Sequence, residues 1–389
     1  MSLFQSRPAL RWLVPTSAAV VVLGGGAAIG TLAAASEPNL PPRDAAQLLV
    51  DLQTARLDGL SGTVLQRADL GLPPALETLA GNSSELAALA TGRHTLRVWY
   101  AGPDQARIAL VGTLGETDVI RNGSDAWVWS SQKKEAVHYK LDPGKKEESP
   151  ELPGGLPATP EEAADKALAA IDPTTEVRVG RSATIAGRDA YELILAPRDK
   201  ASLVEEIRIA IDAEEKVPLR FEVFAEGVEE PAFEVAFTQV DFNRPAPEQF
   251  VFNPPPGTKV TESDAKGAGP DGAPFGGHRP DGESAEPGTA PEQRPETRTV
   301  GTGWTTVLVG TMPESAPGAP GTPGAGGEPG ADLAQLAGML DQFPAVSGDW
   351  GSGRLFSTHL FNVLLTDDGR VIGGLVTPER LYEVAAQTK

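Results

Sequence analysis

Trp127 and Trp129 are the residues whose type and spacing most directly indicate a binding function. They follow an Asn-Gly pair in the stretch "RNGSDAWVWSS". Residues two positions apart in a β-strand share one face and lie about 6.6 Å apart. Their neighbours Ala126 and Val128 are smaller and point to the other face. Two interpretations stay open: the rings belong to a core beneath helices, or they line a cavity for an apolar ligand.

Other residues that could do chemistry lack the spacing that a catalytic or metal site requires. The stretch "WGSGR" does not have the nucleophile-elbow pattern, and "TDDGR" is too short for a calcium loop and predicts a hairpin turn. The chain has no cysteine, which excludes thiolate chemistry and disulfides. The histidines are isolated from one another in the sequence: His94, His138, His278 and His359. We therefore predict a protein that is not an enzyme and has no metal or cofactor.

The charge of the chain limits the partners that it can bind. The formal net charge is −20 and the isoelectric point is near 4.7. A nucleic-acid-binding protein needs a basic face for the phosphate backbone. The sequence therefore predicts no nucleic-acid partner.

The N-terminus predicts export. Arg7 and Arg11 precede an uncharged apolar run over residues 12–36 that ends in small residues. This pattern is typical of a signal peptide, and residues 12–35 are also long enough to span a bilayer. Residues 1–36 are thus either a cleaved signal peptide or a membrane anchor. Both alternatives place the remaining chain in the cell envelope, on the outer side of the cytoplasmic membrane.

The elements that position these side chains form two units in an α+β chain that is mainly antiparallel β. Residues 40–260 predict a helix over 41–57, short helices near 73–81 and 84–92, a helix after Thr159, and a long antiparallel meander. Asn122-Gly123 predicts a type I′ hairpin in which both residues have positive φ. Residues 261–299 are rich in proline, glycine and acidic residues and predict a disordered linker.

The C-terminal unit, residues 300–389, predicts the order β-α-β-β-α and a three-stranded antiparallel sheet. Its elements are a strand at 301–310, a helix at 331–343, a hairpin at 353–376 that turns at Asp368-Gly369, and a helix at 377–387. A Pro/Gly-rich insertion at 313–331 interrupts it.

Several motifs together resemble the LolA/RseB superfamily of extracytoplasmic lipoprotein carriers and envelope-stress regulators. The carrier-like motifs are "GLSGTVLQ", "WYAGPDQARIAL", "NGSDAWVW" and the closing segment "FVFNPPPGTKV". The stretches "VGRSATIAGRDAYELILAPRD" and "IRIAIDAEEKVPLRFEVF" are similar to the regulators. The resemblance covers residues 40–260 well and 300–389 loosely.

The resemblance implies a half-barrel whose concave face is apolar and roofed by helices. In the carriers this cavity takes up acyl chains, and an arginine at the position matching Arg107 hydrogen-bonds the helical lid. Each methylene removed from water is worth about 0.8 kcal/mol, so such a face suits an acyl chain. The candidate cavity residues are Trp99, Arg107, Ala109, Val111, Trp127, Trp129, Phe221, Phe233 and Phe237.

Two functions from different classes follow. In the first, residues 40–260 suffice to bind a lipid acyl chain or a lipoprotein. In the alternative, the chain is an RseB-like regulator that binds an anti-sigma factor or another signalling partner through residues 300–389. A purely structural envelope domain would do neither.

Overall fold

The computed structural model describes residues 38–72, 92–112, 115–141, 159–169, 171–264, 298–311 and 343–388. Several expectations therefore lie outside the described residues. They are the signal peptide or anchor at 1–36, the insertion at 313–331, nearly all of the linker, and, apart from an end residue, the helices expected near 73–81, 84–92 and 331–343.

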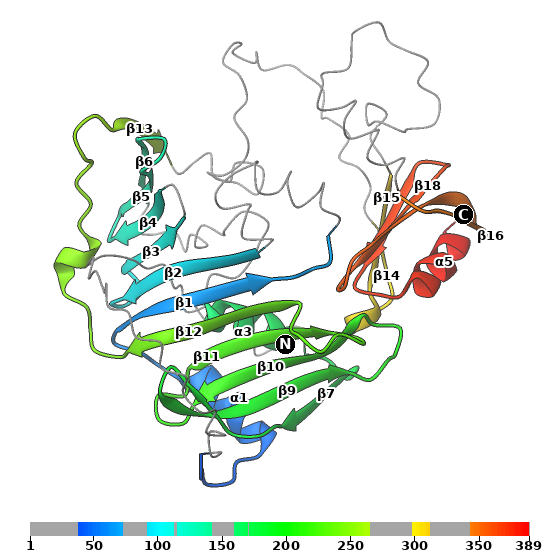
Figure 1. Cartoon of the computed structure of the whole chain (residues 1–389), viewed down its shortest axis with the longest axis horizontal. Helices are drawn as coiled ribbons and strands as arrows, with labels where there is room; N and C mark the ends of the chain where they lie inside the picture. Colours follow the sequence, from blue (N-terminus) through cyan, green and yellow to red (C-terminus); the bar gives the residue numbers. More distant parts are fainter. Residues whose placement is uncertain are drawn as a thin grey trace, which may run out of the picture.

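The larger unit is one curved sheet built around β1, which lies between β2 and β12 (Figure 1). Among the described residues the sheet has 13 strands, in the order β13-β6-β5-β4-β3-β2-β1-β12-β11-β10-β9-β7, with β8 on β9. One half contains β1 (Leu60–Ala68), β2 (Gly92–Tyr100), β3 (Gln105–Val111), β4 (Glu116–Asn122), β5 (Asp125–Ser130) and β6 (Glu135–Lys140). The other contains β7 (Thr175–Val179), β8 (Ala183–Ile185), β9 (Arg188–Pro197), β10 (Val204–Asp212), β11 (Pro218–Ala225) and β12 (Phe233–Asp241). All of these pairs are antiparallel, which confirms the predicted meander.

One strand departs from that pattern. β13 (Lys259–Asp264) pairs with β6 in parallel, at the end of the sheet. Residues 261–264 therefore belong to the sheet, so the predicted linker begins too early. The predicted linker also ends too late, because β14 (Arg298–Val300) begins before residue 299.

Two helices pack on the same face of the large sheet. They are α1 (Ala45–Thr54) and α3 (Pro160–Ala169). Asp44 caps α1 in a capping box with Gln47, which satisfies backbone N–H groups at the helix start. Leu48 of α1 and Ala163 of α3 are buried in one hydrophobic core together with residues from both halves of the sheet. The core thus lies between this face and the helices.

The β4–β5 hairpin turns one residue later than the sequence predicts. Asn122 pairs with Asp125, so Gly123 and Ser124 are the central residues. Gly123 has φ +63°, whereas Asn122 is not among the described non-glycine residues with positive φ. A glycine at the first central position is typical of a type II′ turn. The predicted type I′ turn is therefore wrong, although the hairpin is confirmed.

The smaller unit has more strands than the predicted three. Its described part is a six-stranded antiparallel sheet in the order β14-β15-β19-β18-β17-β16. The further strands are β15 (Val307–Thr311), β16 (Ala345–Gly348), β17 (Gly351–Ser357), β18 (Asn362–Thr366) and β19 (Arg370–Gly374). β14 and β16 are short and lack an alternating apolar pattern, which is why the sequence did not reveal them. Residues 358–361 separate β17 from β18 within the segment that was predicted as one arm of a hairpin.

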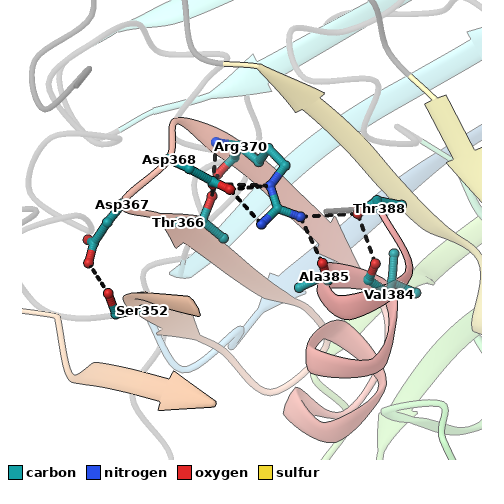
Figure 2. Close-up of polar contacts among 8 residues, drawn as sticks. All are labelled: Ser352, Thr366, Asp367, Asp368, Arg370, Val384, Ala385 and Thr388. Carbon is teal, nitrogen blue, oxygen red and sulfur yellow. Dashed lines mark hydrogen bonds and ion pairs between the residues drawn. The ribbon is translucent and has the colours of Figure 1, made fainter. Parts of the chain in front are cut away.

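Helix α5 (Pro378–Gln387) covers one face of the small sheet. Leu381 and Val384 are fully buried against Leu364 and Ile372. The turn between β18 and β19 holds the helix end: Arg370 donates to the carbonyl oxygen of Ala385 at 2.8 Å, as Figure 2 shows. A cation at a helix C-terminus also offsets the helix dipole.

The two sheets are joined by backbone hydrogen bonds. Leu203 N donates to Leu375 O, and Thr377 N donates to Ala201 O, both at 2.9 Å. Leu360, in the β17–β18 connection, is buried in the core of the large sheet. The fold is therefore the predicted α+β class, mainly antiparallel, with a small second α+β domain packed against the first.

Candidate functional site

The strand register divides the nine candidate residues between the two faces of the large sheet. Residues directly opposite each other in antiparallel strands share a face. Trp99 pairs with Arg107, Arg107 with Ile120, and Ile120 with Trp127. Alternation along β3 and β5 adds the other members of this group. One face therefore carries Trp99, Arg107, Ala109, Val111, Trp127 and Trp129.

The three phenylalanines lie on the other face. Phe237 pairs with Val64, and Val64 pairs with Leu96, which points away from Trp99 in the same strand. Phe233 lies four residues before Phe237 in β12, and Phe221 pairs with Val235 between them. The nine residues therefore do not line one cavity. The face on which the phenylalanines lie is set by the pairing of β1 with β12. The alternation of residues within one strand does not reveal this pairing.

The face with the phenylalanines is the one that α1 and α3 cover. Phe221 and Phe233 meet edge to face with ring centroids 6.5 Å apart. Around them the core is made of aliphatic side chains from both halves of the sheet, including Leu60, Val64, Leu96, Leu193, Ile209 and Leu219. A nearly continuous apolar surface thus extends over the centre of the sheet.

One cavity that the described residues line on this helix-covered face is small. Its volume is about 10 Å³, and it is lined by Leu57, Leu60, Thr159, Glu161, Val217, Pro218 and Phe237. That volume is about what one water molecule needs. An apolar ligand would fit here only if α3 moved away from β11 and β12.

A larger cavity of about 460 Å³ lies near the start of α1 and the β8–β9 turn. Its lining includes Arg43, Arg188 and Glu214. Arg43 pairs with Asp51 at 2.8 Å, and Arg188 pairs with Glu214 at 2.9 Å and also with the buried Asp212. Each of these charged side chains is thus paired with another side chain of the protein. A cavity lined by charged side chains does not suit an apolar acyl chain.

The tryptophans face a segment that crosses the opposite side of the sheet. We call residues 242–258 the strap; they run from β12 through the short helix η4 (Pro247–Phe250) to β13, along one side of the molecule in Figure 1. Phe252 contacts both indoles, with centroid distances of 5.2 Å to Trp127 and 5.8 Å to Trp129. Phe250 is almost fully buried. The rings are therefore covered by the strap and do not line a helix-side cavity.

Arg107 holds the strap to the sheet. Its Nη1 donates to Gln249 O at 3.2 Å, and its Nη2 donates to Asp118 Oδ2 at 2.9 Å. The resemblance implied a bond from Arg107 to a helical lid. The structure places Arg107 on the face away from α1 and α3, and the helix that it hydrogen-bonds is the short η4 of the strap.

Asp118 is the more buried partner of the Arg107–Asp118 ion pair, with 2% of its side chain accessible. Burial raises the pKa of Asp118 to about 7, although the Arg107 guanidinium acts in the opposite direction and Glu116 adds to the rise. Sequence reasoning missed this residue because nothing in "GETDVIRN" marks it. The signal that could have found it is its alternation with Ile120 on the Trp-bearing face.

His138 was treated as isolated, and the structure corrects this. Its ring stacks on Trp127 with centroids 4.0 Å apart, and each ring nitrogen contacts a carboxylate oxygen at 2.8 Å. The carboxylates belong to Asp125 and Glu262, which lie 13 and 124 positions away in the chain. Such a distant partner is not visible in a local sequence pattern.

No group of three or more His, Asp and Glu side chains among the described residues could hold a metal ion. No helix among those residues has the length and apolar character needed to cross a bilayer, and residues 12–35 lie outside them.

No family model and no curated protein matches the chain. Solved structures do. The MucA/MucB complex of Pseudomonas aeruginosa matches at 16% identity over 88% of this chain and 96% of that chain, with a TM-score of 0.38. A LolA superfamily protein from Nitrosomonas europaea matches at 10% identity over 54% of this chain and 99% of that chain, with a TM-score of 0.22.

An uncharacterised conserved protein from Thermus thermophilus also matches, at 12% identity over 56% of this chain and 99% of that chain, with a TM-score of 0.32. MucB and LolA superfamily structures are thus among the solved structures to which this chain is similar. These identities and TM-scores transfer neither a ligand nor a partner to this chain.

Proposed function

We propose that this chain is an exported, non-catalytic binding protein that takes an acyl chain of a lipid or lipoprotein on the helix-covered face of its large sheet. The observation that carries the proposal is the apolar surface on that face, which bears Phe221, Phe233 and Phe237 and is roofed by α1 and α3. Export rests on the uncharged run behind Arg7 and Arg11.

The energetics favour an acyl chain over a polar ligand on this face. Each buried methylene contributes about 0.8 kcal/mol, so ten methylenes offset several kcal/mol of reorganisation. The cavity that the described residues line beside Phe237 holds about one water molecule, so an acyl chain needs more room there. Binding then requires α3 to separate from β11, and the ligand replaces contacts that the helix gives up.

Native mass spectrometry tests the proposal. The full chain, purified from its native host, should carry adducts that fragment to acyl chains, and the delipidated protein should take up an offered phospholipid. Phe237→Gln places an amide in the apolar cavity. Because a buried polar group without a partner costs about 1–3 kcal/mol, we expect uptake to weaken about tenfold or more.

The matched control is Trp127→Gln, the same kind of change on the other face of the sheet. It should leave uptake unchanged, because Trp127 packs against the strap and His138. Thermal melting establishes that both variants fold. An absence of uptake by the wild-type chain, or an equal loss in both variants, would overturn the assignment of the helix-covered face.

The small domain favours a second candidate function, binding of an anti-sigma factor or another signalling protein. Phe356 pairs with Val363, and Leu365 pairs with Val371, on the face of the small sheet opposite α5. Leu308 shares this face and is 52% exposed. An exposed apolar sheet face is a typical protein-binding surface.

Substitution of this face tests the second candidate. Leu308→Glu should abolish binding to the extracytoplasmic segment of an anti-sigma factor in biolayer interferometry. Val251→Glu is the control, because Val251 is also 52% exposed but belongs to the strap. Equal binding by the wild type and Leu308→Glu would remove this face from consideration.

A further inference from the structure

β13 is attached to the large sheet by few side-chain contacts. Among the described strands it pairs with β6 alone, in parallel, and parallel pairing is slightly less stable per residue than antiparallel pairing. Its residues from Lys259 to Glu262 are exposed, and Val260 is 42% exposed. Burial of apolar surface therefore contributes little to holding this strand. The ladder and its ion pairs carry the attachment.

Two ion pairs join β13 to the rest of the described residues, and one of them is weak because both of its side chains are exposed. Lys259 Nζ lies 3.1 Å from Glu135 Oε1, and both side chains are at least half exposed. Exposed pairs of this kind contribute about 0–1 kcal/mol. The other pair joins Glu262 to His138, whose side chain is only 10% exposed. Of the two described side-chain attachments of β13, the one at His138 therefore has the more buried partner.

Both ring nitrogens of His138 face carboxylate oxygens. Nδ1 lies 2.8 Å from Glu262 Oε2, and Nε2 lies 2.8 Å from Asp125 Oδ1. An ionised carboxylate only accepts hydrogen bonds, and a neutral imidazole has a single N–H. Both contacts are hydrogen bonds only when the ring carries two protons. The stacking of the ring on Trp127 also favours the cationic form.

The charged groups that face His138 come from three strands. Asp125 lies on β5, Glu262 on β13, and Lys140 on β6 itself. Lys140 Nζ also bonds Asp125, and the hydrogen bonds from Lys140 and His138 hold the pKa of Asp125 below its ordinary value. Asp125 therefore keeps a cation when His138 is neutral. Glu262, 70% exposed, is the carboxylate free to leave.

We infer that β13 is a releasable edge strand and that the protonated imidazole of His138 fastens it to β6. When the ring loses a proton, a single N–H has to serve two carboxylates, so the hydrogen bonding that holds the exposed Glu262 to the ring is weakened. Imidazoles lose this proton between about pH 5 and 8. Mild acid thus keeps β13 docked, and a rise in pH releases it and opens the edge of β6 beside the strap.

Distances between two spin labels test this inference on the full chain. The chain has no cysteine, so cysteines introduced at Gln132 and Val260, both exposed, take the labels specifically. At pH 5.5 we expect one narrow, short distance that reports the docked strand. At pH 8.5 a longer, broader component should appear, with the ratio of docked to released strand lowered about tenfold or more, as the loss of a hydrogen bond between charged groups implies.

Two variants and one label pair make the result decisive. His138→Gln is neutral at both pH values, so its distance distribution should not change between them. Glu262→Gln should show the released component even at pH 5.5. Labels at Gln132 and Thr238 report the body of the sheet and should give the same distance throughout. A wild-type distribution that is identical at both pH values, or a pH response that persists in His138→Gln, would overturn the inference.

Discussion

The buried carboxylate of Asp118 gives the protein a pH-dependent stability that one substitution should remove. Burial, the largest cause, and Glu116 raise the pKa of Asp118 from 3.8 to about 7 in the folded protein, against the opposing effect of Arg107. In the unfolded chain the carboxyl returns to its ordinary value. Between these two values the folded state therefore binds the proton and the unfolded state does not.

The direction of this pH dependence follows from the direction of the pKa shift. A group whose pKa is raised on folding contributes stability below its unfolded value, and that contribution is lost as pH rises through the folded value. Each pH unit between the two values corresponds to about 1.4 kcal/mol. Asp118 should thus lower the free energy of unfolding by up to about 4 kcal/mol as pH rises from 4 to 8. Arg107 adds only a constant, since a guanidinium keeps its charge over this range.

Urea unfolding of the wild type and Asp118→Asn at half-unit steps from pH 4 to pH 8, followed by tryptophan fluorescence, measures this effect. The quantity of interest is the difference between the two free energies of unfolding. It should fall by several kcal/mol with rising pH, whatever its value at pH 4. Val119→Ala, a buried and non-titrating change in the same strand, should give a difference that does not vary with pH. A wild-type minus Asp118→Asn difference constant within about 1 kcal/mol would refute the reasoning.

Two further predictions concern the framework of the two domains. Gly62→Ala should lower the free energy of unfolding in urea by about 1–3 kcal/mol, because an added Cβ would lie 2.5 Å from Gln239 O and 2.9 Å from the ring of Phe237. Its control is Gly310→Ala, which should lower it little because an added Cβ there meets nothing within 4 Å. Arg370→Ala should lower the free energy of unfolding by about 1–2 kcal/mol and speed amide exchange at the end of α5, because the carbonyl oxygen of Ala385 and the Thr388 hydroxyl lose their donor (Figure 2). Arg380→Ala removes the ion pair with the exposed Glu383 and leaves the end of α5 untouched, so it should not speed amide exchange there and should lower the free energy of unfolding by less than about 1 kcal/mol.

Strand content was predictable because one-sided strands alternate with period two. Residues 92–140 and 175–241 alternate clearly, and the structure has strands there. The start of α5 was predictable from Thr377 and Pro378, which the structure places at the cap and the first helical turn. The short strands β14 and β16 carry few apolar residues, so no periodicity marked them.

The location of the site was not predictable in the same way. Alternation says that Trp127 and Trp129 share a face, but it does not say which face the helices cover. That follows from β1 pairing with both β2 and β12, a contact between residues far apart in the chain. "FVFNPPPGTKV" was recognised as a closing segment, yet its path over the tryptophans depends on Phe250 and Phe252 finding that face.

The two faces of the large sheet should therefore differ in local stability. The helix-covered face buries aliphatic and aromatic side chains from both halves of the sheet and from α1 and α3. The strap covers the opposite face mainly with Phe250 and Phe252, and Trp127 and Trp129 stay partly exposed beneath it. Its described polar attachments include Arg107 to Gln249, Arg244 to the carbonyl oxygens of Asp58 and Ala101, and, at β13, His138 to Glu262. Segments with few buried contacts open at lower free energy than the core. The strap and β13 should therefore open before the core does. A ligand that separates α3 from β11 would act on the helix-covered face, which is the more stable of the two.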